Sequence, residues 1–255
     1  MSIIIKSDQE IAIMRQAGRI TASVLEILKN ELRAGMQTKE LDEIAEREVK
    51  KLGGIPSFKG YHGFPASLCV SVNDEIVHGI PGDMVLHDGD IVSLDFGVIY
   101  EGYQGDSAIT AGVGNISPEA EKLMEVTRDT LQAGIKVAHP GARLGDISAA
   151  IEKYAESRGY SVVREYTGHG IGQQMHEEPR IPNCTHPSFG LMKGTGPELK
   201  KGMTLAIEPM VNIGDWRTSV DDNHWTVRTR DGSLSAHFEN TIAITDNKPS
   251  VLTSI

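Results

Sequence analysis

Cysteine, basic charge and long apolar runs are all scarce in this sequence of 255 residues. Two cysteines, Cys69 and Cys184, cannot form a disulfide framework and indicate a reducing cytoplasm. The net charge of −10 argues against a nucleic-acid partner, which normally meets a basic face. No run approaches the roughly 18 apolar residues of a membrane span, and the charged start MSIIIKSDQE is unlike a signal peptide. These absences predict a cytoplasmic protein with no membrane or nucleic-acid partner.

Neither a low-complexity run nor a Ser/Pro-rich linker divides the chain. Its composition, 39% hydrophobic and 24% charged, is that of a globular protein. The length lies near the upper end of what one hydrophobic core serves, so one large domain or two small ones fit it. We expect a single domain over residues 1–255, built from two related halves, roughly 1–110 and 111–255.

A shift of 106 residues superimposes two helical segments, residues 35–53 and 141–159. Each opens on a turn glycine, carries an acidic residue near the helix start and closes on a glycine suited to a C-cap. Any two amphipathic helices align loosely, but here both terminal glycines match at a single offset. The matched pairs are Gly35 with Gly141, Glu40 with Asp146, Leu41 with Ile147, Glu46 with Glu152 and Gly53 with Gly159.

Each of these segments follows an amphipathic stretch and precedes strand-like runs. The expected strands are residues 66–72 and 90–98 in the first half, and 203–211 and 240–245 in the second. This order predicts an α+β fold in which the two halves share a central sheet with helices on one side. The amphipathic stretches are marked by Ile11, Met14, Ile20, Val24 and Leu28, and by Leu123, Val126 and Leu131.

Five side chains, divided between the two halves, have the character of metal ligands. Four carboxylates and one imidazole form a hard, oxygen-rich set that suits two divalent first-row ions better than one structural zinc. If they converge between the halves, where clefts commonly form, the chain is a metallohydrolase. They are Asp95 in SLDFG, Asp106 in GYQGDSA, His169 in TGHGIG, Glu208 in AIEPM and Glu239 in AHFENT.

Asp95 and Asp106 lie eleven residues apart, with the turn-prone EGYQG between them. A hairpin over that distance places two carboxylates side by side, where they repel unless a cation lies between them. Taken alone, each is more simply an ordinary turn or strand-end aspartate.

Glu208 ends the apolar run MTLAI, and Glu239 lies in SAHFENTIAIT, so both acids are predicted within strands that face a core. Such burial is costly unless the acid is paired or metal-bound, and a buried salt bridge is the alternative. Glycines flank His169 and leave its imidazole unobstructed, although a lone histidine is more often structural. His78, in the turn-rich NDEIVHGIPG, is placed for substrate contact, and Cys69 is expected as a small buried hydrophobe rather than a nucleophile.

The ordered motifs VHGIP, LDFG, GYQGDSA, GHGIGQQMHEEP, AIEPM and SAHFENT together resemble the methionine aminopeptidases, specifically the short type I form. The match covers the whole chain, and the interval from His176 to Glu208 is too short for the helical insertion of the type II enzymes. The resemblance implies the pita-bread fold, with two pseudo-symmetric halves whose helices pack on a central antiparallel sheet. It also implies a cytoplasmic monomer that removes the initiator methionine of nascent polypeptides when the second residue is small. Transient contact with the ribosome stays open.

By the same resemblance the site holds two divalent ions: cobalt, manganese, iron(II) or zinc. Asp95 would bind one ion, Asp106 and Glu239 would bridge both, and His169 with Glu208 would complete the second. A hydroxide held between the ions would then attack the scissile carbonyl carbon.

The resemblance also assigns catalytic and substrate-binding residues. Glu208 would carry a proton to the leaving amine. His176 would donate a hydrogen bond to the scissile carbonyl oxygen, and His78 would form a hydrogen bond near the scissile amide. The methionine pocket would be lined, besides these two histidines, by Phe58, Tyr61, Phe64, Cys69, Met175 and Trp225. Without the family, plain core packing is the simpler account of those six.

Four positions depart from the family pattern: His237 replaces a usual Gln, Asn240 a His, Met175 an aromatic and Phe58 a smaller residue. These departures concern the pocket shape, the second-residue preference and the metal affinity, and leave the ligand set intact. Because the sequence begins Met1–Ser2, the family rule also predicts that Met1 itself is removed.

Two other functions fit the same fold. One is an Xaa-Pro peptidase, although those relatives generally carry a further N-terminal domain. The other is a binding protein without catalysis, against which the complete ligand set and both catalytic histidines argue.

Overall fold

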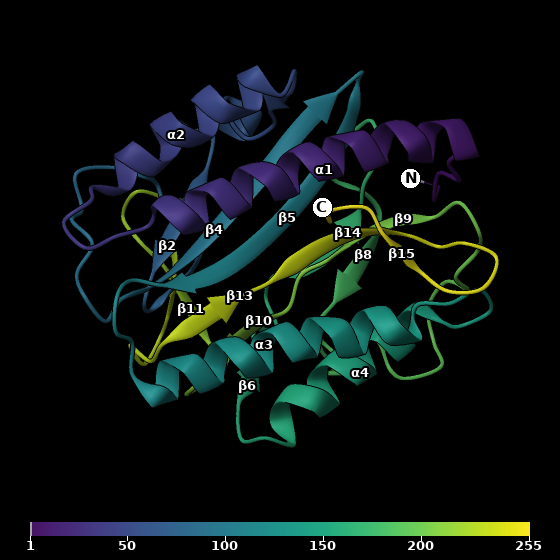
Figure 1. The fold of residues 1–255 in the computed structure, drawn as a ribbon. Helices are drawn as coiled ribbons and strands as arrows, with labels where there is room; N and C mark the ends of the chain where they lie inside the picture. Colours follow the sequence, from purple (N-terminus) through teal and green to yellow (C-terminus); the bar gives the residue numbers. More distant parts are fainter. Residues whose placement is uncertain (1) are drawn as a thin grey trace.

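The computed structural model describes residues 2–255; Met1, whose removal the sequence predicts, lies outside them. Two pairs of helices flank a long twisted sheet, α1 and α2 along one half and α3 and α4 along the other (Figure 1). The helices are α1 (Asp8–Glu31), α2 (Thr38–Lys51), α3 (Pro118–Val137) and α4 (Leu144–Glu156). The α+β fold predicted from the sequence is therefore confirmed.

The longer helix of each pair begins at a serine cap. The Ser7 hydroxyl accepts a hydrogen bond from Glu10 N, and the Glu10 carboxylate accepts one from Ser7 N, which is a complete capping box. The Ser117 hydroxyl accepts a hydrogen bond from Ala120 N at the start of α3, without a reciprocal carboxylate, and Pro118 lies in the first turn. These local signals start each helix where its apolar face begins.

The internal repeat is visible in the backbone as well as in the sequence. Gly35, Gly53, Gly141 and Gly159 all adopt a left-handed conformation, with φ between 80° and 86°. Gln37 N donates to Glu40 at 2.7 Å, and its counterpart Arg143 N donates to Asp146 at 2.8 Å. These matches at the predicted offset establish that α2 and α4 are equivalent elements.

The central sheet runs through both halves in the order β1-β4-β5-β14-β9-β7-β8, with antiparallel pairing throughout. The middle of the sheet joins β5 of the first half to β14 of the second (Figure 1). Its strands are β1 (Ile55–Pro56), β4 (Ile91–Tyr100), β5 (Tyr103–Gly112), β14 (Glu239–Ala243), β9 (Thr204–Ile207), β7 (Thr167–Gly170) and β8 (Glu177–Pro182), with β2 (Cys69–Val72) on β4 and β15 (Ser250–Val251) on β14.

Two small antiparallel sheets extend this frame. One has the order β13-β10-β6, and the other the order β11-β12-β3. Their strands are β13 (Ser235–His237), β10 (Met210–Asn212), β6 (Ser161–Val162), β11 (Thr218–Val220), β12 (Val227–Thr229) and β3 (Glu75–Val77), and a short 3-10 turn covers Tyr61–Gly63.

Three of the four expected strands are present with shifted or shortened ends, and the fourth is divided. Residues 203–211 form two strands, β9 and β10, which belong to different sheets. Pro209 separates them, because a proline has no N–H for a sheet ladder. Glu208 is consequently the first residue beyond β9 rather than a residue within a strand, which corrects the sequence-based expectation.

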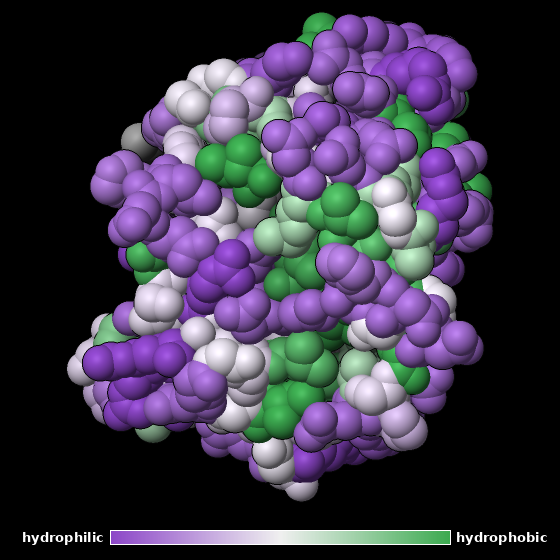
Figure 2. Space-filling model, turned by 90° about the vertical axis from the view of Figure 1, so that its left-hand side faces the viewer, coloured by the Kyte–Doolittle hydropathy of each residue, from purple (hydrophilic) through white to green (hydrophobic). Residues whose placement is uncertain are grey.

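Each half has its own hydrophobic cluster. In the first half, α1 and α2 pack Val24, Leu28 and Leu41 against β4, whose Phe96 is fully buried. In the second, α3 and α4 contribute apolar side chains to a cluster that includes strands β9 and β14. On the face drawn in Figure 2, hydrophobic residues form separate small patches among hydrophilic ones. No helix within residues 2–255 is long and apolar enough to cross a membrane.

Helix α1 approaches β5 so closely that one position has no room for a side chain. A Cβ on Gly105 would lie 2.6 Å from Gly18 N. We expect Gly105→Ala to lower the free energy of unfolding by about 2–3 kcal/mol, because α1 would have to move off the sheet. Urea unfolding measures the effect. The matched control is Gly82→Ala, where a Cβ meets nothing within 4 Å, and there the change stays below about 0.5 kcal/mol.

Candidate metal centre and active site

The register of β4 and β5 places two of the predicted ligands on one face of the hairpin. Asp95 lies opposite Ala108, and Asp106 lies two residues before Ala108 on the same strand. Because directly opposed residues and alternate residues share a face, both carboxylates project to the same side. The hairpin expected from their spacing brings them together.

The second half supplies the remaining three residues, two from adjoining strands and Glu208 from the end of a third. Glu239 begins β14 and lies opposite Ala108, so Asp95 and Glu239 flank that alanine from its two neighbouring strands. His169 on β7 pairs with Ala206 of β9, two residues before Glu208. The junction between the halves therefore gathers all five.

The five side chains converge without hydrogen-bonding one another. His169 Nε2 lies 3.8 Å from Asp106 Oδ2 and 3.6 Å from Glu208 Oε1. Ligand atoms of Asp106, His169 and Glu239 all lie within 4.8 Å of one another. Asp95 Oδ1, Asp106 Oδ1 and Glu239 Oε1 are buried and have no hydrogen-bond partner among residues 2–255. Buried oxygens without donors fit a cation, because native proteins otherwise satisfy such atoms.

The electrostatics of the cluster agree with that fit. Burial raises the pKa of Asp106 to about 7. Burial, followed by the neighbouring carboxylates of the cluster, raises the pKa of Asp95, Glu208 and Glu239 well above their usual range. Four carboxylates with no cation among them repel when ionised, and divalent ions would relieve this.

His169 has the form that a metal requires. Burial, followed by the nearby His176, lowers the pKa of His169 to about 3, so its imidazole is neutral. Its Nδ1 lies 2.8 Å from the carbonyl oxygen of Gly170, which leaves Nε2 directed at the carboxylates. The donor set therefore matches divalent first-row ions.

Two further imidazoles border the cluster. His176 is exposed, stacks on Tyr61 and has its Nδ1 2.8 Å from the Tyr61 hydroxyl oxygen. Partial burial, followed by the nearby His62, lowers the pKa of His176. His78 has a φ of 59° and packs edge-on against Trp225, and burial lowers its pKa to about 4. Both histidines are thus uncharged at neutral pH.

One cavity of about 230 Å³ is bordered by every residue that the sequence analysis names for the site. Phe64 and Trp225 meet edge to face at 5.2 Å between ring centroids. Cys69 lies opposite Asp95 in the β2–β4 register, and burial raises the pKa of its thiol well above the usual range. Cys69 is therefore an uncharged wall of the cavity. The full lining is Phe58, Tyr61, His62, Phe64, Cys69, His78, Asp95, Asp106, His169, Met175, His176, Glu208, Trp225 and Glu239.

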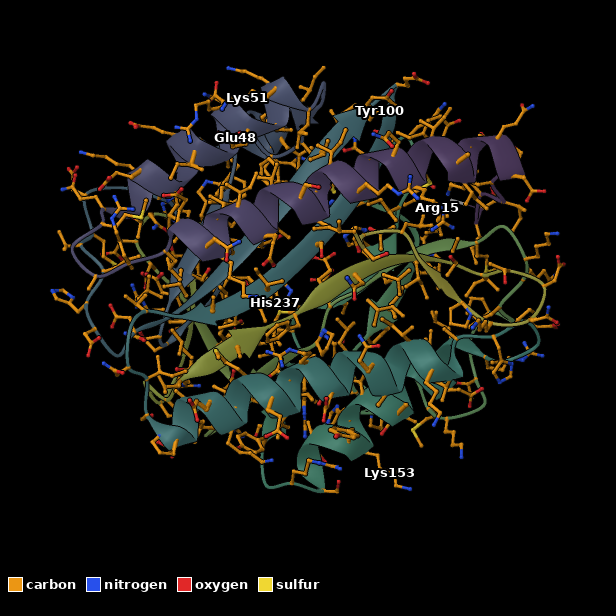
Figure 3. All side chains as sticks on the ribbon, viewed as in Figure 1. Arg15, Glu48, Lys51, Tyr100, Lys153 and His237 are labelled. Carbon is orange, nitrogen blue, oxygen red and sulfur yellow. The ribbon has the colours of Figure 1, made fainter. Side chains whose placement is uncertain are left out.

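Two residues at the site were not predicted from the sequence to be functional. His62 lines the cavity with its ring 4.3 Å from that of Tyr61, and its position next to Tyr61 in KGYHGFP was the available signal. His237, noted only as a departure, lies buried on β13 with Nε2 4.0 Å from Glu208 Oε2 (Figure 3). Neither of its ring nitrogens has a hydrogen-bond partner among residues 2–255.

The carboxylate repulsion predicts how the metal-free protein responds to pH. A carboxyl whose pKa is raised on folding stabilises the fold below its unfolded pKa, and this contribution is lost as the pH rises through the folded value, about 7 for Asp106. Asp106→Asn should therefore raise the free energy of unfolding of metal-free protein at pH 8 by roughly 2 kcal/mol, and much less at pH 5. Urea unfolding in a chelator measures both. A destabilised Asp106→Asn protein at pH 8 would contradict the repulsion.

Known proteins place the chain in a family. The model for metallopeptidase family M24 matches residues 12–246. Methionine aminopeptidase 1 of Bacillus subtilis is 54% identical over 253 residues, which cover 99% of this chain and 100% of the relative. The crystal structure of a methionine aminopeptidase from Thermotoga maritima has a TM-score of 0.96 at 45% identity, over 100% of both chains. A prolidase from Pyrococcus furiosus, of which the match covers 66%, shares the fold alone, with a TM-score of 0.78 at 22% identity.

These structures confirm the pita-bread fold that the motifs imply. The identities and coverage also confirm the resemblance stated from the sequence. The chain belongs to metallopeptidase family M24 and, within it, to the type I methionine aminopeptidases, hydrolases that remove the N-terminal methionine.

Proposed function

We propose that this chain removes the initiator methionine of nascent polypeptides whose second residue is small, using two divalent ions. The observation that carries the proposal is one cavity of about 230 Å³, bordered on one part by buried carboxylate oxygens without hydrogen-bond partners and on another by apolar side chains. The carboxylates fit cations, and the apolar part of the lining fits one side chain. Their adjacency fits hydrolysis of the bond that follows that side chain.

Five side chains would hold the ions. They are Asp95, Asp106, His169, Glu208 and Glu239. Bound ions would lower the pKa of water in the site and so supply the nucleophile. Cobalt, manganese, iron(II) and zinc all suit this donor set, and the metal available in the cell decides among them.

The substrate's free α-amine would face the carboxylate cluster, while its methionine side chain would enter the apolar part of the cavity. Phe64, Cys69 and Met175 are buried in its wall, and Phe58, Tyr61 and Trp225 are partly exposed beside them. Aromatic and sulfur-containing side chains make favourable contacts with a thioether. An internal residue has no free amine, which restricts the reaction to chain ends.

His176 would stabilise the charge that develops on the scissile carbonyl oxygen. Burial raises the pKa of the Tyr61 hydroxyl, which therefore keeps its proton and would donate a hydrogen bond to His176 Nδ1, 2.8 Å away. The single ring proton of the neutral imidazole then lies on Nε2, which donates to the carbonyl oxygen. Tyr61 would in this way select the useful tautomer.

Glu208 would move the proton that hydrolysis requires. Burial, Asp95 and Asp106 together raise the pKa of its carboxyl, so Glu208 can accept a proton from water and pass it to the leaving amine. His78, edge-on to Trp225 at the cavity wall, would hydrogen-bond near the scissile amide.

The wider setting rests on the same family assignment. We propose that residues 1–255 form a single domain, since one sheet passes through both halves. The free, buried Cys69 and Cys184 suit a reducing cytoplasm. Action as a monomer and transient contact with the ribosome stay predictions.

Release of methionine from short peptides tests the proposal. Metal-stripped protein is titrated with manganese, iron(II), cobalt and zinc, and assayed on Met-Gly, Met-Leu and Ala-Pro peptides. We expect metal-dependent release from Met-Gly and little from Met-Leu, with two ions bound per chain by mass spectrometry of the native protein. Preferential cleavage of Ala-Pro would instead indicate an Xaa-Pro peptidase. Binding of two ions without any cleavage would indicate a binding protein.

The role of Tyr61 gives a second prediction. Tyr61→Phe should lower kcat by about tenfold and leave KM within about twofold, because the hydroxyl acts on His176 in the transition state. Tyr154→Phe is the control, since it loses one hydroxyl bond, to Asp129 at 2.8 Å, outside the cavity. Equal kcat values for the two variants would refute the tautomer role.

A further inference from the structure

Lys6, a buried charged residue of the N-terminal segment, contacts Glu177, the residue that follows His176. The Lys6 side chain is 3% exposed and its Nζ forms an ion pair with the Glu177 carboxylate, which is 6% exposed. Lys6 Nζ also donates to the carbonyl oxygen of Ile4 at 3.3 Å, and Lys6 N donates to that of Gly202 at 2.8 Å. The segment is thereby fixed against the turn that follows β7.

Glu177 is the first residue of β8, where that turn ends, and it directly follows His176. Its second carboxylate oxygen accepts a hydrogen bond from Gln174 N at 3.2 Å, which closes residues 174–177 on themselves. A Cβ on Gly172 would lie 2.4 Å from Glu177 Oε1 and 2.5 Å from Lys6 Cε. The turn, the carboxylate and the lysine stem therefore pack in direct contact, without space for a larger residue.

The other side of the turn is held by β5. Gln104 N donates to the carbonyl oxygen of Gly172 at 2.8 Å, and Gln104 Nε2 donates to that of Gln173 at 3.3 Å. Ser57 in turn donates to Gln104 Oε1 at 2.6 Å. Residues 172–173 are thus bound to the sheet through Gln104, whereas the end of the turn nearest His176 is bound to Lys6.

His176 itself has few restraints of its own. It is exposed, and its ring contacts only Tyr61, through the hydroxyl and by stacking, and the His169 ring at 4.2 Å between centroids among the aromatic and hydrogen-bond contacts of the described residues. Loss of Lys6 would leave the Glu177 carboxylate buried without its cation, which is strongly unfavourable. The carboxylate would move toward water and carry the adjacent backbone with it, and small displacements of a group that contacts the transition state are costly in rate.

We propose that Lys6 is a positioning residue of the active site, acting through Glu177 on the placement of His176. The proposal rests on the proposed function, in which His176 donates to the scissile carbonyl oxygen. The N-terminal segment is then part of the catalytic apparatus, although no atom of it lines the cavity among the residues described.

The test compares Lys6→Met, which keeps the length and loses the charge, with Glu177→Gln and with the double variant. The control is Lys201→Met, which breaks the exposed pair with Asp246 on the same turn as Gly202. Each full-length protein is assayed on a Met-Gly peptide with the metal that activates the wild type. Folded fraction and bound metal are measured alongside. The His176 ring resonances of the metal-free protein, assigned with His176→Asn, give a readout independent of activity.

We expect Lys6→Met to lower kcat at least about tenfold with KM within about twofold, and to shift the His176 resonances, while Lys201→Met changes neither. Because Lys6 acts through Glu177, the double variant should be no slower than the slower single variant. The proposal would be overturned by an unchanged kcat in folded Lys6→Met protein. It would also be overturned if the loss of activity matched the loss of folded fraction or of bound metal, or if the losses of the two single variants added in the double variant. A wild type inactive with every metal would refute the proposed function instead, and the resonances would still test the positioning of His176.

Discussion

Repulsion among four buried carboxylates is the constraint on which the rest of this structure depends. Asp95, Asp106, Glu208 and Glu239 share one cavity, and their pKa values are all raised. A fold holds such a cluster only if its backbone is fixed by other forces, and here the strands that carry it pair with one another over a long antiparallel ladder. The two hydrophobic clusters beneath the helices stabilise that ladder from either half. The scaffold thus holds carboxylates that repel one another, and relief of this repulsion contributes to the affinity for cations.

The symmetry of the fold explains how so many acids reach one place. Each half contributes strands to the middle of the sheet, and Ala108 at the junction lies opposite Asp95 on one side and Glu239 on the other. A small side chain there leaves the space between two carboxylates open. Neither half alone contains a complete donor set, so the site exists only where the halves pair.

Much of this arrangement could be predicted from the sequence, because the signals are local. The matched glycines at an offset of 106 residues indicate left-handed turns, which few other residues tolerate. The acids in apolar runs indicate burial that is costly unless the acid has a partner. The division of residues 203–211 into two strands depends on which sheet each part joins. The sequence pattern does not contain that information, and it therefore predicted Glu208 within a strand. The pair of Lys6 with Glu177 spans 171 positions and belongs to no repeat or motif, and only the folded chain brings it together. Likewise, His62 enters the cavity through a left-handed backbone, with φ of 48°, that its sequence does not demand.

The late place of Glu239 in the chain has a consequence for biosynthesis. A growing polypeptide that ends before β14 has Asp95 and Asp106 on a finished hairpin, yet it lacks the strand that closes the central sheet between β5 and β9. Such a fragment exposes the edges of both neighbouring strands and lacks the Glu239 carboxylate. Prematurely terminated chains are therefore prone to association through those edges. On the proposed function they also lack one metal ligand, so that activity would indicate completed synthesis.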